Sequence, residues 1–227
     1  MRVTSAGERR AALCLCLFGG VLLGLGLVVS APDSTPPQTL EWLDSPRRIG
    51  HFVLESETGV FDRRALTGQW TIVSFGFLNC PDICPTALAQ LASLSAGLNH
   101  SSATPVRYLF VSVDPARDSL AQISHYVAQF DSSIEGATGE PAQLRRFADG
   151  LGVQFKVTGI GQNTQVAHSI TYSIVDPSGS LRGRFKPGFD AAHLIHKLID
   201  RLRSIPHLAG DAEAAQAQKK LEEGAHG

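Results

Sequence analysis

The pattern of apolar and polar positions predicts alternating strands and helices along the middle of the chain. Two mostly apolar runs, WTIVSFGF at 70–77 and VRYLFVSV at 106–113, are typical of strands that are buried on both faces of a sheet. Other segments place apolar residues at helical spacing and therefore predict helices. They are TALAQLASLSAGL at 86–98, LAQISHYVAQF at 120–130 and PAQLRRFADGL at 141–151.

Hairpins and a last helix complete this pattern. Each hairpin has two short β-type runs on either side of a turn rich in polar residues and glycine. The runs are HFVLES and VF at 51–61, and SITYSIVD and SLRGRF at 169–185, and the helix is DAAHLIHKLIDRLR at 190–203. Strand–helix alternation that ends in a hairpin and a helix is the order of a thioredoxin-like α/β domain. We predict this domain at 47–205.

The N-terminus has a different pattern. Arg2, Arg9 and Arg10 precede an uncharged apolar run over 11–29. At 1.5 Å per residue this run nearly matches a hydrocarbon core of roughly 30 Å, so residues 1–30 are predicted to be a transmembrane anchor. A cleaved signal peptide is the alternative, but the run is longer than the usual core of about 7–15 residues.

The arginines favour a cytoplasmic N-terminus, which sends the rest of the chain across the membrane. We therefore expect a bacterial inner-membrane protein whose domain lies in the periplasm. Residues 31–46 begin with the proline-rich APDSTPPQT and are predicted to be a linker. Residues 206–227 are predicted to be a flexible tail.

Charge and cysteine usage narrow the chemistry. A net charge of −1 with dispersed basic residues gives no reason to expect nucleic acid as a partner. Of four cysteines, Cys80 and Cys84 are the only pair outside the apolar run. A lone close pair is typical of redox or metal chemistry, and a disulfide across so short a loop would stabilise little. Because Met1 is the only methionine, a soft metal would have to be held by thiolate and imidazole.

The cysteine pair follows a predicted central strand and precedes a predicted helix. Open α/β sheets place their sites at the carboxyl ends of such strands. Pro85 suits the first turn of that helix, whose positive end should lower the pKa of Cys84 and favour the thiolate. A thiolate can bind a soft metal or attack a disulfide, so both functions remain open here.

Three segments carry specific motifs in combination: FGFLNCPDICPTALAQL at 75–91, FVSVDPARDS at 110–119 and VAHSITYSIVDPSG at 166–179. Together they resemble the Sco/SenC family of copper chaperones of cytochrome c oxidase assembly. The resemblance covers residues 47–205 and implies a thioredoxin-like fold. It also implies that Cys80, Cys84 and His168 bind copper, as Cu(I) or Cu(II). Ala167 departs from the family, which commonly has an acidic residue before the histidine.

The resemblance implies delivery of copper to the dinuclear site of cytochrome c oxidase subunit II, or to another cuproprotein. The alternative is a thiol–disulfide oxidoreductase in which Cys80 and Cys84 act on the cysteines of that oxidase site. We expect a metallochaperone rather than an enzyme. Other candidates have simpler interpretations: Asp114 and Asp118 are predicted to shape a turn, and His193 and His196 to lie on an ordinary amphipathic helix. Asp82 could equally tune the cysteines or face solvent.

Overall fold

The computed structural model describes residues 40–204 apart from 82, 102–103, 159–164 and 169, and for 165–168 it describes the backbone. The predicted anchor, the first part of the predicted linker, and the predicted tail lie outside the described residues. So does Asp82. Within the described part of the chain, no helix is both long and apolar enough to cross a membrane.

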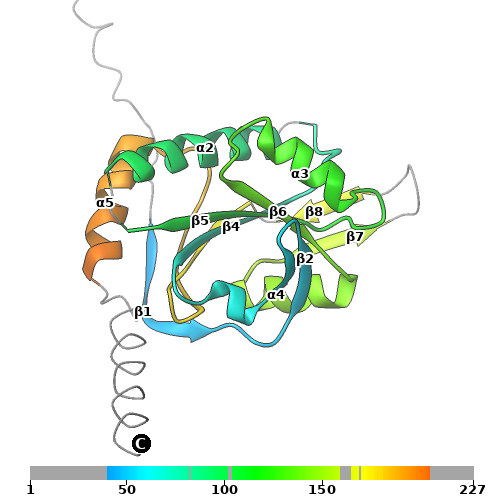
Figure 1. Ribbon diagram of the computed structural model, residues 1–227, viewed down its shortest axis with the longest axis horizontal. Coiled ribbons are helices and arrows are strands. Elements are labelled where there is room, and N and C mark those ends of the chain that lie inside the picture. The colour runs from blue at the N-terminus through cyan, green and yellow to red at the C-terminus, as the bar shows by residue number, and fades with distance from the viewer. Residues whose placement is uncertain (1–39, 82, 102–103, 159–164, 169, 205–227) are drawn as a thin grey trace, which may run out of the picture. The chain divides into compact units, whose positions relative to one another are not determined.

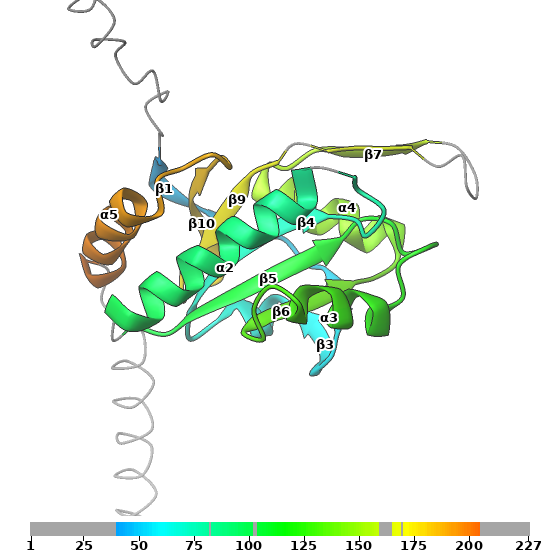
Figure 2. The same cartoon turned by 90° about the horizontal axis from the view of Figure 1, so that it is seen from above.

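A mixed sheet of eight strands forms the centre of the described residues. Its strands are β1 (Glu41–Arg48), β2 (Val53–Ser56), β3 (Gly59–Asp62), β4 (Trp70–Gly76), β5 (Val106–Ser112), β6 (Ile134–Thr138), β9 (Tyr172–Val175) and β10 (Ser180–Phe185). In space they follow the order β1-β10-β9-β4-β5-β6-β2-β3 (Figures 1 and 2). Two further strands, β7 (Phe155–Thr158) and β8 (Gln165–His168), form a separate antiparallel ribbon.

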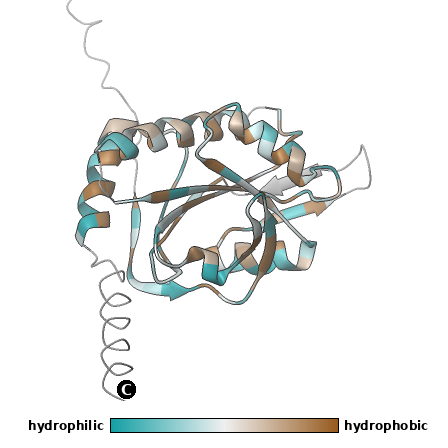
Figure 3. Cartoon of the chain, in the orientation of Figure 1, coloured by the Kyte–Doolittle hydropathy of each residue, from teal (hydrophilic) through white to brown (hydrophobic). Residues whose placement is uncertain are grey.

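The centre of the sheet is parallel and its flanks are antiparallel. Strands β4, β5 and β6 run parallel to one another, whereas β9 runs antiparallel to β4. Every residue of β4 is buried, as its mostly apolar sequence predicted (Figure 3). Because β9 runs opposite to β4, the start of β9 lies beside the carboxyl end of β4. The mixed α/β, thioredoxin-like architecture is confirmed.

Helices cover both faces of this sheet (Figure 1). One face carries α2 (Ile83–Ser101), α3 (Leu120–Ala128) and α5 (Ala191–Ser204), and the other carries α4 (Pro141–Leu151) and the short 3-10 helix η1 (Arg63–Leu66). The predicted helices are confirmed, and α3 begins where Ser119 and Gln122 form a capping box. Helix α2 begins two residues before Pro85, which puts Cys84 in its first turn.

The structure corrects the predicted linker and adds strands. Residues 41–46, assigned to the linker, belong to β1, which pairs with β10 at the edge of the sheet. Charged residues and Pro46 conceal this strand because an edge strand is largely exposed and tolerates them. Strands β6, β7 and β8 were not predicted either, and each is only four or five residues long.

Candidate functional site

The two cysteines lie at the connection between β4 and α2, Cys80 in the loop and Cys84 in the first turn of the helix. Cys80 and Cys84 are buried, with exposed fractions of 7% and 2%, and they are thiols rather than a disulfide. The Cys80 backbone N–H donates to the Phe77 carbonyl at 3.3 Å. The Cys84 backbone N–H donates to the Cys80 sulfur at 3.4 Å. The first turn of α2 therefore holds the Cys80 sulfur against the residue that carries the second thiol.

Burial reverses the predicted effect of the helix on Cys84. Removal of the side chain from water is the main cause that raises the pKa of the Cys84 thiol to about 12, and a hydrogen bond with the Cys80 side chain adds to it. The expectation of a lowered pKa was wrong because the field of a helix end is smaller than this desolvation. Cys84 is thus a protonated thiol at neutral pH, and a metal ion that binds its sulfur must displace that proton.

Glycine at the end of β4 lets the Cys84 sulfur pack closely on the strand. A Cβ at Gly76 would lie 3.2 Å from Cys84 Sγ and 2.6 Å from Cε2 of Phe110. A larger residue would have to displace the aromatic ring or the sulfur. The absence of a side chain at Gly76 thereby leaves the space in which the Cys84 sulfur packs against β4.

Asp118 fixes the loop that precedes Cys80. Its Oδ2 accepts hydrogen bonds from the Leu78 backbone N–H at 2.9 Å and from Ser112 Oγ at 2.6 Å. Asp118 is 2% exposed, so these hydrogen bonds are shielded from water. Asp114 instead pairs with Arg117 and accepts through its carbonyl from the backbone of the same turn. Both aspartates shape the turn as predicted, and Asp118 also holds the cysteine loop.

The Asp118 carboxyl makes stability depend on pH. Burial raises the pKa of Asp118 above its ordinary value of 3.8, so the folded protein keeps this proton to a higher pH than the unfolded chain does. The free energy of unfolding therefore falls as the pH rises from about 3.8 through the raised pKa. We expect Asp118→Asn to lose less stability than the wild type between about pH 4 and about pH 7 in urea unfolding. Equal losses in the two proteins would contradict this.

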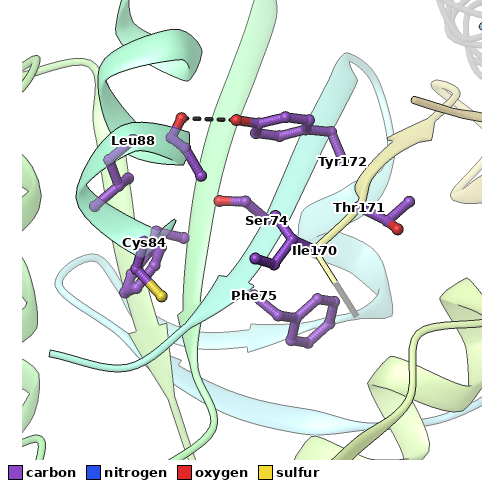
Figure 4. Close-up of a pocket in the computed structure, with 9 residues that line it drawn as sticks. Ser74, Phe75, Cys84, Leu88, Ile170, Thr171 and Tyr172 are labelled. Carbon is purple, nitrogen blue, oxygen red and sulfur yellow. Dashed lines mark hydrogen bonds between the residues drawn. The ribbon is translucent and has the colours of Figure 1, made fainter. Parts of the chain in front are cut away.

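The backbone of His168 lies close in sequence to the segment that enters β9 beside the cysteine site. His168 is the last residue of β8 and lies opposite Phe155 of β7. Its side chain is outside the described part of the structure. Two and three residues later, Ile170 and Thr171 line a small cavity together with Cys84 (Figure 4). The chain path thus brings the His168 segment towards the cysteines, while ligation by this histidine stays a prediction.

Other metal-binding candidates gain no support within the described residues. No three His, Cys, Asp or Glu side chains gather there in a way that could hold a metal ion. His193 and His196 are exposed on α5, whose Leu194 and Leu198 are buried, so the amphipathic interpretation is confirmed.

A buried dithiol at the carboxyl end of a central parallel strand, covered by the following helix, defines a protein of the thioredoxin-like class. The chain belongs to the SCO1/SenC family, whose model matches residues 43–203. It is 33% identical to the mitochondrial protein SCO1 of Saccharomyces cerevisiae over 163 residues, which are 70% of this chain and 55% of that protein. The chain therefore spans little more than half of this relative.

Solved structures show the same likeness. The crystal structure of yeast Sco1 with copper bound has a TM-score of 0.65 at 32% identity, covering 74% of this chain and 94% of that chain. The crystal structure of Arabidopsis thaliana ScoI with copper bound has a TM-score of 0.63 at 31% identity, covering 69% of this chain and 98% of that chain. Both relatives carry copper on the fold described above.

Proposed function

We propose that this protein is a copper metallochaperone that holds copper through Cys80, Cys84 and His168. Its recipient would be the dinuclear copper site of cytochrome c oxidase subunit II or another cuproprotein. The observation that carries the proposal is the hydrogen bond from the Cys84 backbone to the Cys80 sulfur, which holds the buried Cys80 sulfur against the first turn of α2, where the buried Cys84 lies. Two solved relatives with copper bound support it.

The donor atoms fit copper. Thiolates are soft ligands that favour Cu(I), imidazole also suits copper, and two thiolates with one imidazole can complete three-coordination. The hydrogen bonds of Asp118 hold the cysteine loop, and the space left by Gly76 lets the Cys84 sulfur pack on β4, so the sulfurs are positioned before the ion arrives. Less ordering is then needed upon binding. Release would follow by ligand exchange, in which each bond from a recipient's ligand to copper replaces one from this chain.

The thiol–disulfide alternative fits the site less well. The attacking species in disulfide exchange is a thiolate that must reach its partner sulfur. Both sulfurs are buried, and burial raises the pKa of Cys84 far above neutral pH. A metal ion offsets this cost by its own charge, whereas a disulfide does not.

We also propose that residues 1–30 anchor the chain in the bacterial inner membrane, with the domain in the periplasm.

An anaerobic titration of the reduced full chain in detergent, with Cu(I) and a competing chelator, tests the proposed function. We expect one tightly bound equivalent per chain. His168→Ala should weaken binding by at least about 10-fold, because even loss of an outer partner of a metal ligand costs that much. The matched control is His193→Ala, which removes an exposed histidine on α5 and should leave the affinity unchanged.

Absence of stoichiometric binding would overturn the proposed function. Equal affinities of His168→Ala and His193→Ala would remove His168 from the ligand set.

A further inference from the structure

A small cavity lies between β4, the first turns of α2 and the segment that enters β9 (Figure 4). Its volume is about 10 Å³, which is room for about one water molecule. Its wall is mostly apolar, with polar atoms contributed by a few side chains. Ser74, Cys84 and Tyr172 are among its lining residues.

Ser74 brings an unsatisfied hydroxyl to this cavity. Its side chain belongs to β4 and is only 6% exposed, and its Oγ has no hydrogen-bond partner among the described residues. A buried hydroxyl without a partner is unfavourable, because it has lost its hydrogen bonds to water and gained none in return. Figure 4 shows this oxygen directed into the space between Cys84 and Tyr172. The position of the hydroxyl therefore points to a polar occupant.

Tyr172 supplies a second polar atom, a hydroxyl oxygen that can still accept a hydrogen bond. Its hydroxyl donates to the Ala87 carbonyl at 2.7 Å, so its proton is used and its oxygen can still accept. Cys84 supplies a sulfur, which is a weak acceptor as a thiol and a strong one as a thiolate. These three groups match the two to four partners that a buried water requires.

We propose that this cavity is a binding site for one water molecule, which links Ser74 to the sulfur of Cys84. The water accepts from Ser74 Oγ and donates to Cys84 Sγ and to the Tyr172 hydroxyl oxygen. This role extends the proposed copper function, because a hydrogen bond to a ligating sulfur withdraws electron density from it. Such a bond favours Cu(I) over Cu(II). Ser74 is thus a positioning residue that acts on the metal through the water.

Ser74→Ala tests this proposal with two readouts. In crystals of the metal-free full chain at atomic resolution, we expect a water peak in the wild-type cavity and none in the variant. With copper bound, the variant's preference for Cu(I) over Cu(II) should fall by about 10-fold, seen as a lower reduction potential. The sulfur-to-Cu(II) charge-transfer band should move to lower energy.

Ser173→Ala is the matched control. Ser173 is another fully buried hydroxyl without a described partner, but it does not line the cavity. We expect this variant to keep the wild-type potential and band. A dry wild-type cavity would overturn the proposal, and so would a potential and band in Ser74→Ala equal to those of Ser173→Ala. If the wild type binds no copper, the proposed function fails, and the crystals alone still decide whether the water site exists.

Discussion

Replacing Cys84 with serine is expected to weaken Cu(I) binding by more than about 100-fold, because loss of an outer partner of a metal ligand already costs up to that much. Serine keeps the size and polarity of the side chain but exchanges a soft sulfur for a hard oxygen. The remaining backbone hydrogen bond to the Cys80 sulfur should persist, since it uses the N–H of residue 84. The measurement is the anaerobic Cu(I) titration against a chelator.

Cys14→Ser is the matched control for this prediction, because it makes the same change in the predicted membrane anchor. We expect Cys14→Ser to bind Cu(I) as the wild type does. Wild-type affinity in Cys84→Ser would show that Cys84 is not a ligand.

Replacing Trp70 with alanine is expected to destabilise the fold by about 3–5 kcal/mol, which is typical of a buried tryptophan. Trp70 begins β4 and is 0% exposed in the core under α2. Its ring lies 6.1 Å from that of Trp42 on β1, so the change also loosens the edge of the sheet. Urea unfolding of the variant and the wild type measures the loss.

The matched control here is Trp42→Ala, which removes the half-buried partner of the same ring pair and should cost less. The Cu(I) affinity of folded Trp70→Ala should equal that of the wild type, because β4 separates this position from the cysteines by about 20 Å. If folded Trp70→Ala lost as much Cu(I) affinity as Cys84→Ser, a loss of stability would be enough to weaken binding. The result for Cys84→Ser would then not identify Cys84 as a ligand.

The sequence predicted those helices and strands whose apolar residues form a long run or recur at helical spacing. Strands β4 and β5 are long and apolar because both of their faces are covered, and α4 shows a clear helical spacing. Strand β6 gave no such signal, because its IEGAT sequence contains one large apolar residue. Its Gly136 is needed since a Cβ there would lie 2.7 Å from Cγ2 of Ile123 on α3. That requirement comes from tertiary packing, which local patterns do not carry.

The cysteine pair could be predicted, but its surroundings could not. The close spacing of Cys80 and Cys84 is a local signal. The hydrogen bond from Leu78 to Asp118 joins residues 40 positions apart, and the contact of Ser74 with the cavity depends on where β9 pairs. The pKa of Cys84 was predicted in the wrong direction for the same reason, since the sequence does not show how deeply the sulfur is buried.

The position of β9 next to β4 has a consequence for the biosynthesis of the protein. Cys80 and Cys84 leave the ribosome well before Ile170 and Tyr172, which complete the wall around Cys84. Until β9 pairs with β4, a nascent chain presents the Cys84 thiol without that wall. A stalled or truncated chain would therefore offer this cysteine to oxidants and stray metals. Completion of the sheet is what turns a reactive thiol into a protected one.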